Sequence, residues 1–390
     1  MNSKKKCPIV FLINSLCEGG AERAMLTLSK QFVKDGHSVT ILALSKNNFY
    51  TIPKGVEMVY LSKMNDSLLG LIKMFYMPYH AWRLKQYVKK HNVVLVQSYL
   101  FRANFVNLLS RILGAKQLIQ VVNRSVVSRF WNEGLSGKIN LSLIGYLYPR
   151  ADMIIHISMQ MKDDFNKHFF IRKNEKVIYN PYDIKAVLSQ SSEAIEDFTF
   201  KSHKRYLITV GRLIPLKRFQ DVLEALSRLD SDIELILLGD GVERKFLEEL
   251  AKELLIEKRV HFLGQVENPF KYIKKSDIFI SSSAVEGFPN VLIESMLCKT
   301  VVISSDCLSG PREILAPKSN ISKRLSKGME LNEFGILYAV GDIVALVEAS
   351  KKILFDNNLL YEYKQRAFIR AKDFSVESIA MEYKEVLCYG

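Results

Sequence analysis

The feature that most constrains the fold of this chain is a regular alternation between short apolar runs and amphipathic stretches. Helical spacing of apolar residues is clear at 21–34, 217–229, 243–256, 290–298 and 342–355. Strands that are apolar along nearly their whole length are typical of parallel sheets that helices cover on both faces. The pattern therefore predicts an α/β fold. The apolar runs lie at residues 9–13, 39–44, 93–96, 118–122, 153–157, 176–178, 206–210, 234–238, 260–262, 278–281 and 301–304.

Residues 186–204 interrupt this alternation with a polar, serine-rich stretch that has no clear period, so we interpret them as an interdomain linker. A chain of 390 residues is too long for one small core and long enough for two domains. We predict two Rossmann-like, doubly wound domains that face a cleft, at residues 1–185 and 186–371. A C-terminal helix at 372–390 is expected to pack back on the first domain. In such folds ligands bind at the carboxyl ends of the strands.

The charge of the chain is unevenly distributed. Its 55 Lys and Arg residues exceed its 41 Asp and Glu residues, which gives a net charge of +14. Residues 1–180 hold 26 of the basic and 10 of the acidic residues, so the remaining 29 basic and 31 acidic residues leave the second half nearly neutral. A basic surface attracts nucleic acid, anionic lipid or phosphorylated substrates. The two halves are therefore expected to have different partners.

The five cysteines are widely scattered, and no pair has the CxxC spacing of a metal site. The apolar run at 9–13 is too short for a signal peptide, and no window reaches the roughly 18 apolar residues that a membrane-spanning helix needs. We therefore expect reduced thiols in a cytoplasmic protein that is soluble, or that lies on a membrane without crossing it.

Two glycines, Gly19 and Gly20, lie between the first predicted strand and the first predicted helix. Glycine lets a backbone approach a ligand closely, and the N-terminus of a helix favours an anion. A tight strand-to-helix turn explains the two glycines equally well. The spacing is not that of a GxGxxG fingerprint, which argues against a dehydrogenase.

Two cations, Arg212 and Lys217, follow the predicted strand at 206–210. An arginine offers a planar fork and a lysine a compact charge, and together they suit a diphosphate. The alternative is that both belong to a solvated helix start.

The most informative motif is the segment EGFPNVLIE at 286–294, which follows the predicted strand at 278–281. Pro289 suits the first position of a helix, so free N–H groups near Asn290 and Val291 would face a ligand. Glu286 can accept hydrogen bonds from sugar hydroxyls, and Glu294 can hold a ribose diol. The alternative is that both glutamates face solvent.

Four motifs in this order closely resemble the retaining nucleotide-sugar glycosyltransferases of family four, which have the two-domain GT-B fold. They are Gly-Gly-Ala-Glu-Arg at 19–23, Gly-Arg-Leu at 211–213 with Lys217, Glu-x7-Glu at 286–294, and Ser-Asp…Gly-Pro-x-Glu at 305–313. The resemblance covers nearly the whole chain and implies a role in bacterial surface polysaccharide, lipopolysaccharide or glycoconjugate synthesis. The Ser-Gly-Pro-Arg-Glu form resembles members that use UDP-sugars, often N-acetylhexosamines; a hexose is the other candidate.

The resemblance also implies roles for single residues. Arg212 and Lys217 would neutralise the departing diphosphate, Glu286 would hold the donor sugar, and Glu294 would bind the nucleotide ribose. No cofactor or bound metal is expected, because cationic side chains supply the electrostatic stabilisation. The triplet 230–232, which mimics a metal-binding DxD, is interpreted as a solvated turn. The backbone that would complete the donor site is that of Gly19, Gly20, Gly287, Phe288, Pro289, Asn290 and Val291.

The acceptor side departs from the family pattern. Many members carry a histidine after the strand that corresponds to 118–122, whereas this chain has Asn123 and Arg124, which we expect to position the acceptor. No general base stands out. In the front-face mechanism the leaving phosphate oxygen takes the proton of the acceptor, so Glu286 and Glu294 are not the acid and nucleophile of a hydrolase.

Residues 66–91 mix aromatic and basic side chains with little acid, which suits docking on the anionic inner face of the cytoplasmic membrane. Pro78 predicts a break into two helices. A core helix with solvated lysines is the alternative. The first domain is then expected to bind a lipid-linked or oligosaccharide acceptor.

Two other functions compete with sugar transfer. One is a nucleotide-sugar epimerase or phosphorylase on the same fold. The other is a basic nucleic-acid-binding protein, which would leave the motifs of the second half unexplained, so nucleic acid is not an expected partner.

Overall fold

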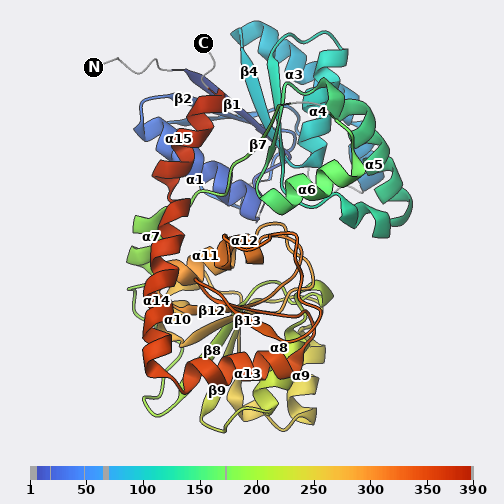
Figure 1. Ribbon diagram of the computed structural model, residues 1–390. Coiled ribbons are helices and arrows are strands. Elements are labelled where there is room, and N and C mark those ends of the chain that lie inside the picture. Colours follow the sequence, from blue (N-terminus) through green and yellow to red (C-terminus); the bar gives the residue numbers. More distant parts are fainter. Residues whose placement is uncertain (1–6, 18, 48, 65–69, 172–173, 388–390) are drawn as a thin grey trace. The chain divides into compact units, whose positions relative to one another are not determined.

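The computed structural model describes residues 7–17, 19–47, 49–64, 70–171 and 174–387, and the chain divides into two compact units (Figure 1). Unit 1 holds the chain up to Tyr182 together with the C-terminal segment from Val376, and unit 2 holds Asp183–Ser375. The predicted linker at 186–204 begins inside helix α7 (Ile184–Gln190), so that part of the prediction is wrong. The helix forms because the Asp183 side chain caps it, accepting the N–H of Ala186 at 3.0 Å.

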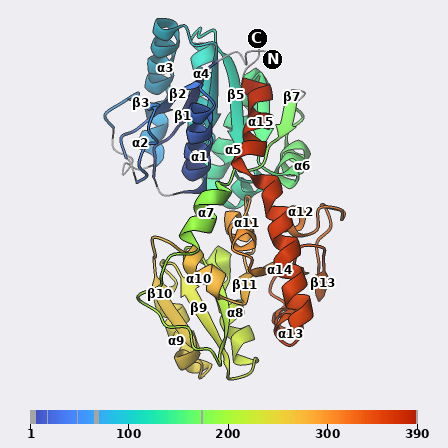
Figure 2. The same ribbon diagram turned by 90° about the vertical axis from the view of Figure 1, so that its left-hand side faces the viewer.

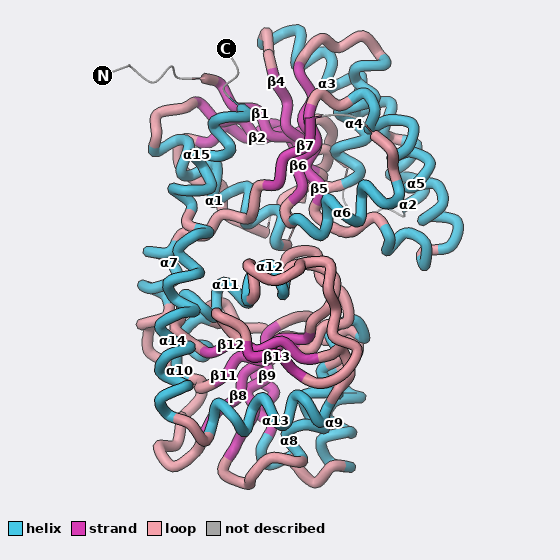
Figure 3. Tube along the Cα trace, viewed as in Figure 1, coloured by secondary structure: helices cyan, strands magenta, loops and turns pink. Residues whose placement is uncertain are grey.

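Unit 1 is built, within the described residues, on a parallel sheet of seven strands in the order β3-β2-β1-β4-β5-β6-β7. Figure 3 shows helices on both faces of the strands. Its strands are β1 (Pro8–Ile13), β2 (Ser38–Ala43), β3 (Val56–Tyr60), β4 (Leu95–Tyr99), β5 (Leu118–Asn123), β6 (Met153–His156) and β7 (Asn174–Val177). Its helices are α1 (Gly20–Lys34), α2 (Gly70–Phe75), α3 (Met77–His91), α4 (Phe101–Ile112), η1 (Ser128–Asn132), α5 (Gly134–Leu147), η2 (Tyr148–Arg150), α6 (Met159–His168) and α15 (Val376–Leu387).

The continuous apolar sequence of β1 is explained by burial on both faces of the sheet. Successive side chains of a strand point to opposite faces. Val10 and Leu12 join a core cluster with residues of α3 and α4. Phe11 packs instead against Phe32 of α1, with ring centroids 6.4 Å apart. The C-terminal helix α15 lies beside α1 (Figure 1), and Gln120 of β5 donates to a carbonyl of α15 at 2.5 Å.

Unit 2 repeats this topology, within the described residues, in a seven-stranded sheet with the order β10-β9-β8-β11-β12-β14-β13, in which only β13 is antiparallel to its neighbour (Figure 2). Its strands are β8 (Arg205–Val210), β9 (Ile233–Leu238), β10 (Val260–Gly264), β11 (Ile278–Ser281), β12 (Val301–Ser305), β13 (Met329–Leu331) and β14 (Ile336–Tyr338). Its helices are α7, η3 (Pro215–Lys217), α8 (Phe219–Ser227), α9 (Arg244–Glu253), η4 (Glu257–Arg259), α10 (Phe270–Lys275), α11 (Asn290–Leu297), α12 (Pro311–Leu315), α13 (Ile343–Leu354), α14 (Asn357–Ala371) and η5 (Lys372–Phe374).

Both sheets have the strand order of the doubly wound fold, so the α/β prediction is confirmed. Each changes direction between its first and fourth strands, β1 and β4 in unit 1 and β8 and β11 in unit 2. Ligands of such sheets bind outside the carboxyl ends of these strands. Strands β3, β13 and β14 were not predicted, because β3 is only half-buried and the other two have three residues each.

The expectation for the cysteines is met in part. Cys17, Cys298 and Cys307 are free thiols, whereas Cys7 is disulfide-bonded, so the expectation of reduced thiols is wrong for Cys7. Positions along the chain carry no information on which thiols meet in space, which is why the spacing argument missed it. Cys388 lies outside the described residues.

Across the described ranges, no helix is both long enough and apolar enough to span a bilayer.

Candidate active site

The candidate site of unit 2 lies where its sheet changes direction. Strands β8 and β11 pair in parallel, so their carboxyl ends are neighbours. Arg212 and Lys217 follow β8, and Glu286 follows β11. The structure therefore brings the predicted cationic turn and the predicted carboxylate to the same edge of the sheet.

Lys217 and Glu286 form a direct ion pair. The Lys217 ammonium donates to Oε1 of Glu286 at 2.5 Å, and the hydroxyl of Ser283 donates to the same oxygen at 2.6 Å. The side chains of Lys217 and Glu286 are 24% and 13% exposed, so neither is a freely solvated surface group. Arg212 is exposed, and its guanidinium has no partner in the part of the chain that the structure describes. One cation is thus held and the other is open to a ligand.

The turn that carries Lys217 is fixed to the segment after β11 by two hydrogen bonds. The Ser282 hydroxyl donates to the Lys217 carbonyl at 2.7 Å, and the Ala284 N–H donates to the Leu216 carbonyl at 2.8 Å. Arg218 then takes a left-handed conformation, with φ of 49°, and binds Asp221 in the first turn of α8. This asymmetry between neighbours leaves Lys217, rather than Arg218, directed at Glu286.

Helix α11 begins one residue after the proline that was expected at its first position. It starts at Asn290, and Pro289 is the N-cap residue rather than the first helical residue. The segment from Gly287 to Val291 leads into this helix, where first-turn N–H groups have no preceding helical turn to bond. Glu294 is only 5% exposed, so the alternative of two solvent-facing glutamates is wrong.

The loop after β12 packs closely on the start of α11. Gly310 has a φ of 102°, and a Cβ atom there would lie 2.5 Å from Cδ of Pro289. The Glu286 N–H donates to the Leu308 carbonyl at 2.6 Å, and the Ser309 hydroxyl donates to the Gly287 carbonyl at 2.6 Å. The motif at 305–313 therefore supports the backbone of the motif at 286–294.

A buried ion-pair network holds this loop in place, and the sequence did not reveal it. Arg312 is 1% exposed and binds both oxygens of the fully buried Asp306, at 3.0 and 2.5 Å. It also donates to Glu330 of β13 at 3.0 Å. Burial lowers the pKa of Arg312, but its bonds to these two carboxylates raise it by more. Arg312 belongs to the motif at 305–313, but only the fold brings Glu330 to it.

A second feature that the sequence reasoning missed is the glycine loop after β9. A Cβ atom at Gly239 would lie 1.9 Å from the carbonyl oxygen of Gly211. The Leu213 N–H donates to the Asp240 carbonyl at 2.9 Å. The segment Gly-Asp-Gly at 239–241 directly follows a strand, and this signal in the sequence could have identified it.

Cys307 follows Asp306 of the buried ion-pair network directly in sequence, and its thiol is neutral. Burial raises the pKa of its thiol to about 12, and the Glu286 carboxylate contributes to the rise. A protonated thiol is a poor nucleophile.

The residues 230–232 are all exposed, in agreement with their interpretation as a solvated turn.

In unit 1 the predicted glycines lie at the turn from β1 to α1. Gly20 is the first residue of α1 and Gly19 is its N-cap residue. The Arg124 guanidinium, from the loop after β5, donates to the Gly20 carbonyl at 3.1 Å. Burial lowers the pKa of Arg124, and nearby tyrosines, among them Tyr383 of α15, oppose this change. Arg124 therefore links the loop after β5 to the start of α1 at the carboxyl edge of the first sheet.

Asn123 is placed differently from Arg124. It is the last residue of β5, it is 2% exposed, and its side chain accepts the Tyr148 hydroxyl at 3.0 Å. Its amide also contacts the ring of His156, which is fully buried. Burial lowers the pKa of His156 to about 3, and the nearby Lys162 contributes, so this imidazole is neutral. Asn123 is thus bonded inside unit 1.

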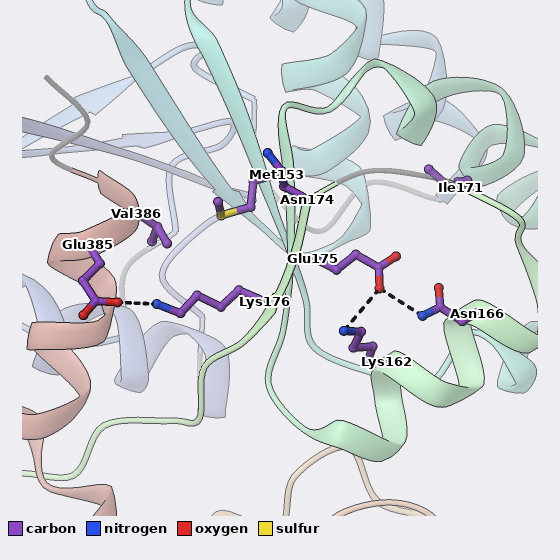
Figure 4. A pocket seen from close by; sticks show the side chains of 9 residues that line it. All are labelled: Met153, Lys162, Asn166, Ile171, Asn174, Glu175, Lys176, Glu385 and Val386. Carbon is purple, nitrogen blue, oxygen red and sulfur yellow. Dashed lines mark hydrogen bonds and ion pairs between the residues drawn. The ribbon is translucent and has the colours of Figure 1, made fainter.

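A cavity of about 670 Å³ lies elsewhere in unit 1, beside the edge strand β7 (Figure 4). Two cations line it, but Lys176 pairs with Glu385 at 2.6 Å and Lys162 with Glu175 at 3.9 Å. No predicted site residue contributes to its wall. We therefore do not assign substrate binding to this cavity.

Solved structures place the fold in a known class. HepE of Anabaena, crystallised with UDP, aligns with a TM-score of 0.78 at 22% identity over 98% of this chain and 99% of that protein. WaaG, described as a glycosyltransferase involved in lipopolysaccharide biosynthesis, aligns with a TM-score of 0.70 at 15% identity over 98% and 100%. With two doubly wound units, the chain has the GT-B fold of glycosyltransferases.

The sequence comparisons identify the family. Residues 18–186 match the family model Glycosyltransferase Family 4, and residues 190–370 match Glycosyl transferases group 1. A Campylobacter jejuni protein named N-acetylgalactosamine-N,N'-diacetylbacillosaminyl-diphospho-undecaprenol 4-alpha-N-acetylgalactosaminyltransferase is 31% identical over 95% of this chain and 97% of its own length. The lipopolysaccharide 1,6-galactosyltransferase of Salmonella typhimurium is 32% identical over 44% of this chain and 47% of its own length. The chain belongs to the family-four glycosyltransferases, as its motifs predicted, and the nucleic-acid-binding alternative is set aside.

Proposed function

We propose that the protein transfers an N-acetylhexosamine or a hexose from a UDP-sugar to a lipid-linked or oligosaccharide acceptor, with retention of anomeric configuration. The observation that carries the proposal is the Lys217–Glu286 pair at the carboxyl ends of β8 and β11, 2.5 Å apart, with the exposed Arg212 on the same turn. Two cations and a carboxylate there match the opposite charges of a diphosphate and the hydroxyls of a sugar.

The comparisons support the choice of donor and acceptor. The Campylobacter relative is named for adding N-acetylgalactosamine to a saccharide on diphospho-undecaprenol, which is a lipid-linked acceptor. HepE, which shares the fold, was crystallised with UDP. For this chain a UDP-sugar and a lipid-linked acceptor are therefore the first substrates to test.

In the proposed step, the bond between the anomeric carbon and the β-phosphate oxygen breaks while the acceptor oxygen bonds to the same face of that carbon. The acceptor proton passes to the departing β-phosphate oxygen, so sugar transfer releases UDP and requires no protein base. Arg212 and Lys217 stabilise the charge that develops on the diphosphate. Glu286 orients the donor sugar, and Glu294 the ribose. The proposed step uses no metal ion.

A donor screen followed by product analysis tests this function. Thermal shift against UDP-, GDP- and ADP-sugars should show stabilisation by the UDP-sugars, because a ligand that binds only the folded state raises its stability. The product linkage, determined by NMR, should keep the anomeric configuration of the donor, with equal rates with and without EDTA. An inverted linkage, or epimerised sugar from donor alone, would contradict the proposal.

We also propose that unit 1 docks on an anionic membrane through the outer face of α3. Pro78 lies in the first turn of α3, and the break from α2 falls just before it, as predicted. The buried side chains of α3 pack in the core of unit 1, so the alternative of a core helix is correct for one face of α3. The opposite face of α3 exposes Trp82, which is 49% exposed, together with Arg83 and Lys89. Phe75, at the end of α2, is 84% exposed. Residues 66–69 of the predicted segment lie outside the described residues.

Co-sedimentation with vesicles tests this docking. Replacing Arg83 and Lys89 by Glu should weaken binding to vesicles that contain anionic lipid by at least fivefold per position, since a basic residue near such a surface contributes about 1 kcal/mol. Trp82→Ser should weaken it as well. Phe355→Ser is the matched control, because Phe355 is 65% exposed on unit 2. Equal binding to neutral vesicles, or unchanged binding of the variants, would overturn the docking proposal.

A further inference from the structure

The Glu286 carboxylate uses its two oxygens unequally. Both the Lys217 ammonium, at 2.5 Å, and the Ser283 hydroxyl, at 2.6 Å, donate to Oε1. Within the described residues, no protein group donates to Oε2. A carboxylate oxygen has more than one lone pair, so Oε1 can hold both donors at once while Oε2 stays open. Oε2 is therefore the oxygen that can accept a hydroxyl of a bound sugar.

Ser283 is itself firmly held. It is 2% exposed, and its carbonyl accepts the hydroxyl of Ser305, at the end of β12, at 2.6 Å. The neighbouring Ser282 is also buried, and its hydroxyl binds the Lys217 carbonyl at 2.7 Å. Consecutive serines after β11 thus each hold one partner of the ion pair. Ser283 acts on the carboxylate, and Ser282 acts on the backbone of the lysine.

We propose that Ser283 is a positioning residue that holds Glu286 in place when Lys217 leaves it for the donor diphosphate. This inference rests on the proposed function. In the donor-free chain the charge of Lys217 is neutralised by Glu286, so a diphosphate must take the lysine over from the carboxylate. The Ser283 hydroxyl then remains the protein donor to Oε1, and it keeps Oε2 directed at the sugar.

The variant Ser283→Ala separates this role from a general loss of structure. We expect kcat/KM for the UDP-sugar to fall by about tenfold or more, the effect of a lost hydrogen bond to a charged group. Affinity for UDP alone should stay within about twofold, because UDP lacks the donor sugar that Glu286 orients. Ser283→Thr, which keeps the hydroxyl, should recover most of the activity. Ser350→Ala is the matched control, since Ser350 is a buried serine of α13 that bonds only within its own helix.

Assaying Glu286→Gln beside these variants distinguishes a failure of the inference on Ser283 from a failure of the proposed function. A Ser283→Ala enzyme with wild-type kcat/KM, next to an inactive Glu286→Gln enzyme, would overturn the inference and leave the proposed function intact. Wild-type activity in both would refute the site itself. Equal losses of UDP binding and sugar transfer would also overturn the inference, because a purely structural role predicts them. Should Ser283→Ala fail to fold, Ser305→Ala decides: reduced transfer with normal UDP binding supports the role of Ser283, and unchanged transfer overturns it.

Discussion

Replacing Glu286 by glutamine is expected to lower kcat/KM for sugar transfer by about 10²- to 10³-fold, the loss typical of removing one preorganised electrostatic group from an active site. Glutamine has the shape of glutamate but no charge, so its amide oxygen is a weaker acceptor for a donor-sugar hydroxyl than the carboxylate, which pairs with Lys217 at 2.5 Å when no donor is bound. The fold should survive, because the Glu286 backbone bonds to Leu308 and Ser309 do not involve the side chain. Transfer assays and far-UV circular dichroism of the purified variant measure the two effects.

Lys217→Ala provides the complementary measurement. If Lys217 and Glu286 act as a unit, the double variant should lose less than the sum of the two single losses in free energy. Glu333→Gln is the matched control, since Glu333 pairs with Lys318 on the surface, where the side chains are 42% and 82% exposed. Full additivity, or wild-type transfer by Glu286→Gln, would show that the pair does not form the site.

Replacing Arg312 by methionine is expected to lower the free energy of unfolding of unit 2 by about 3–5 kcal/mol. Methionine fills much of the volume of arginine, but it leaves the Asp306 carboxylate fully buried without its cation. For a unit of this size such a loss corresponds to a fall in Tm of about 10 °C. Differential scanning calorimetry of the whole chain measures it, and UDP-sugar should raise the remaining transition.

Two comparisons isolate the cause of this effect. Arg366→Met removes a pair with Glu362 in which both side chains are about half exposed, and it should cost no more than about 1 kcal/mol. Adding Asp306→Asn to Arg312→Met should recover part of the loss, because the unpaired charge disappears with it. A Tm for Arg312→Met that matches that of Arg366→Met would show that the buried network contributes little to stability.

Most of the strands that the sequence predicted correctly are buried along nearly their whole length, whereas β7 and β10 are only partly buried. The run at 206–210 is apolar except for Thr209, because Leu207 packs in one core cluster while its buried neighbours Tyr206 and Ile208 face the other side of the sheet. The half-exposed β3 gave no such signal. The donor motifs could also be predicted from the sequence. A short segment that follows a strand lies at the carboxyl edge of a parallel sheet, whatever the position of that strand in the sheet. The predicted position of Pro289 was wrong by one residue, because a proline is compatible with the N-cap position as well as with the first turn of a helix.

The sequence by itself determined the fold class, the family and the residues that follow β8 and β11, because each depends on local pattern and on order along the chain. Only the tertiary structure showed that Lys217, rather than Arg218, meets Glu286, since the left-handed backbone of Arg218 turns that side chain toward Asp221. It alone paired Arg312 with Glu330, eighteen residues apart in sequence, and placed Ser283 on the carboxylate. Hydrogen bonds of this kind depend on distances of a few tenths of an ångström between segments that only the packed sheet brings together.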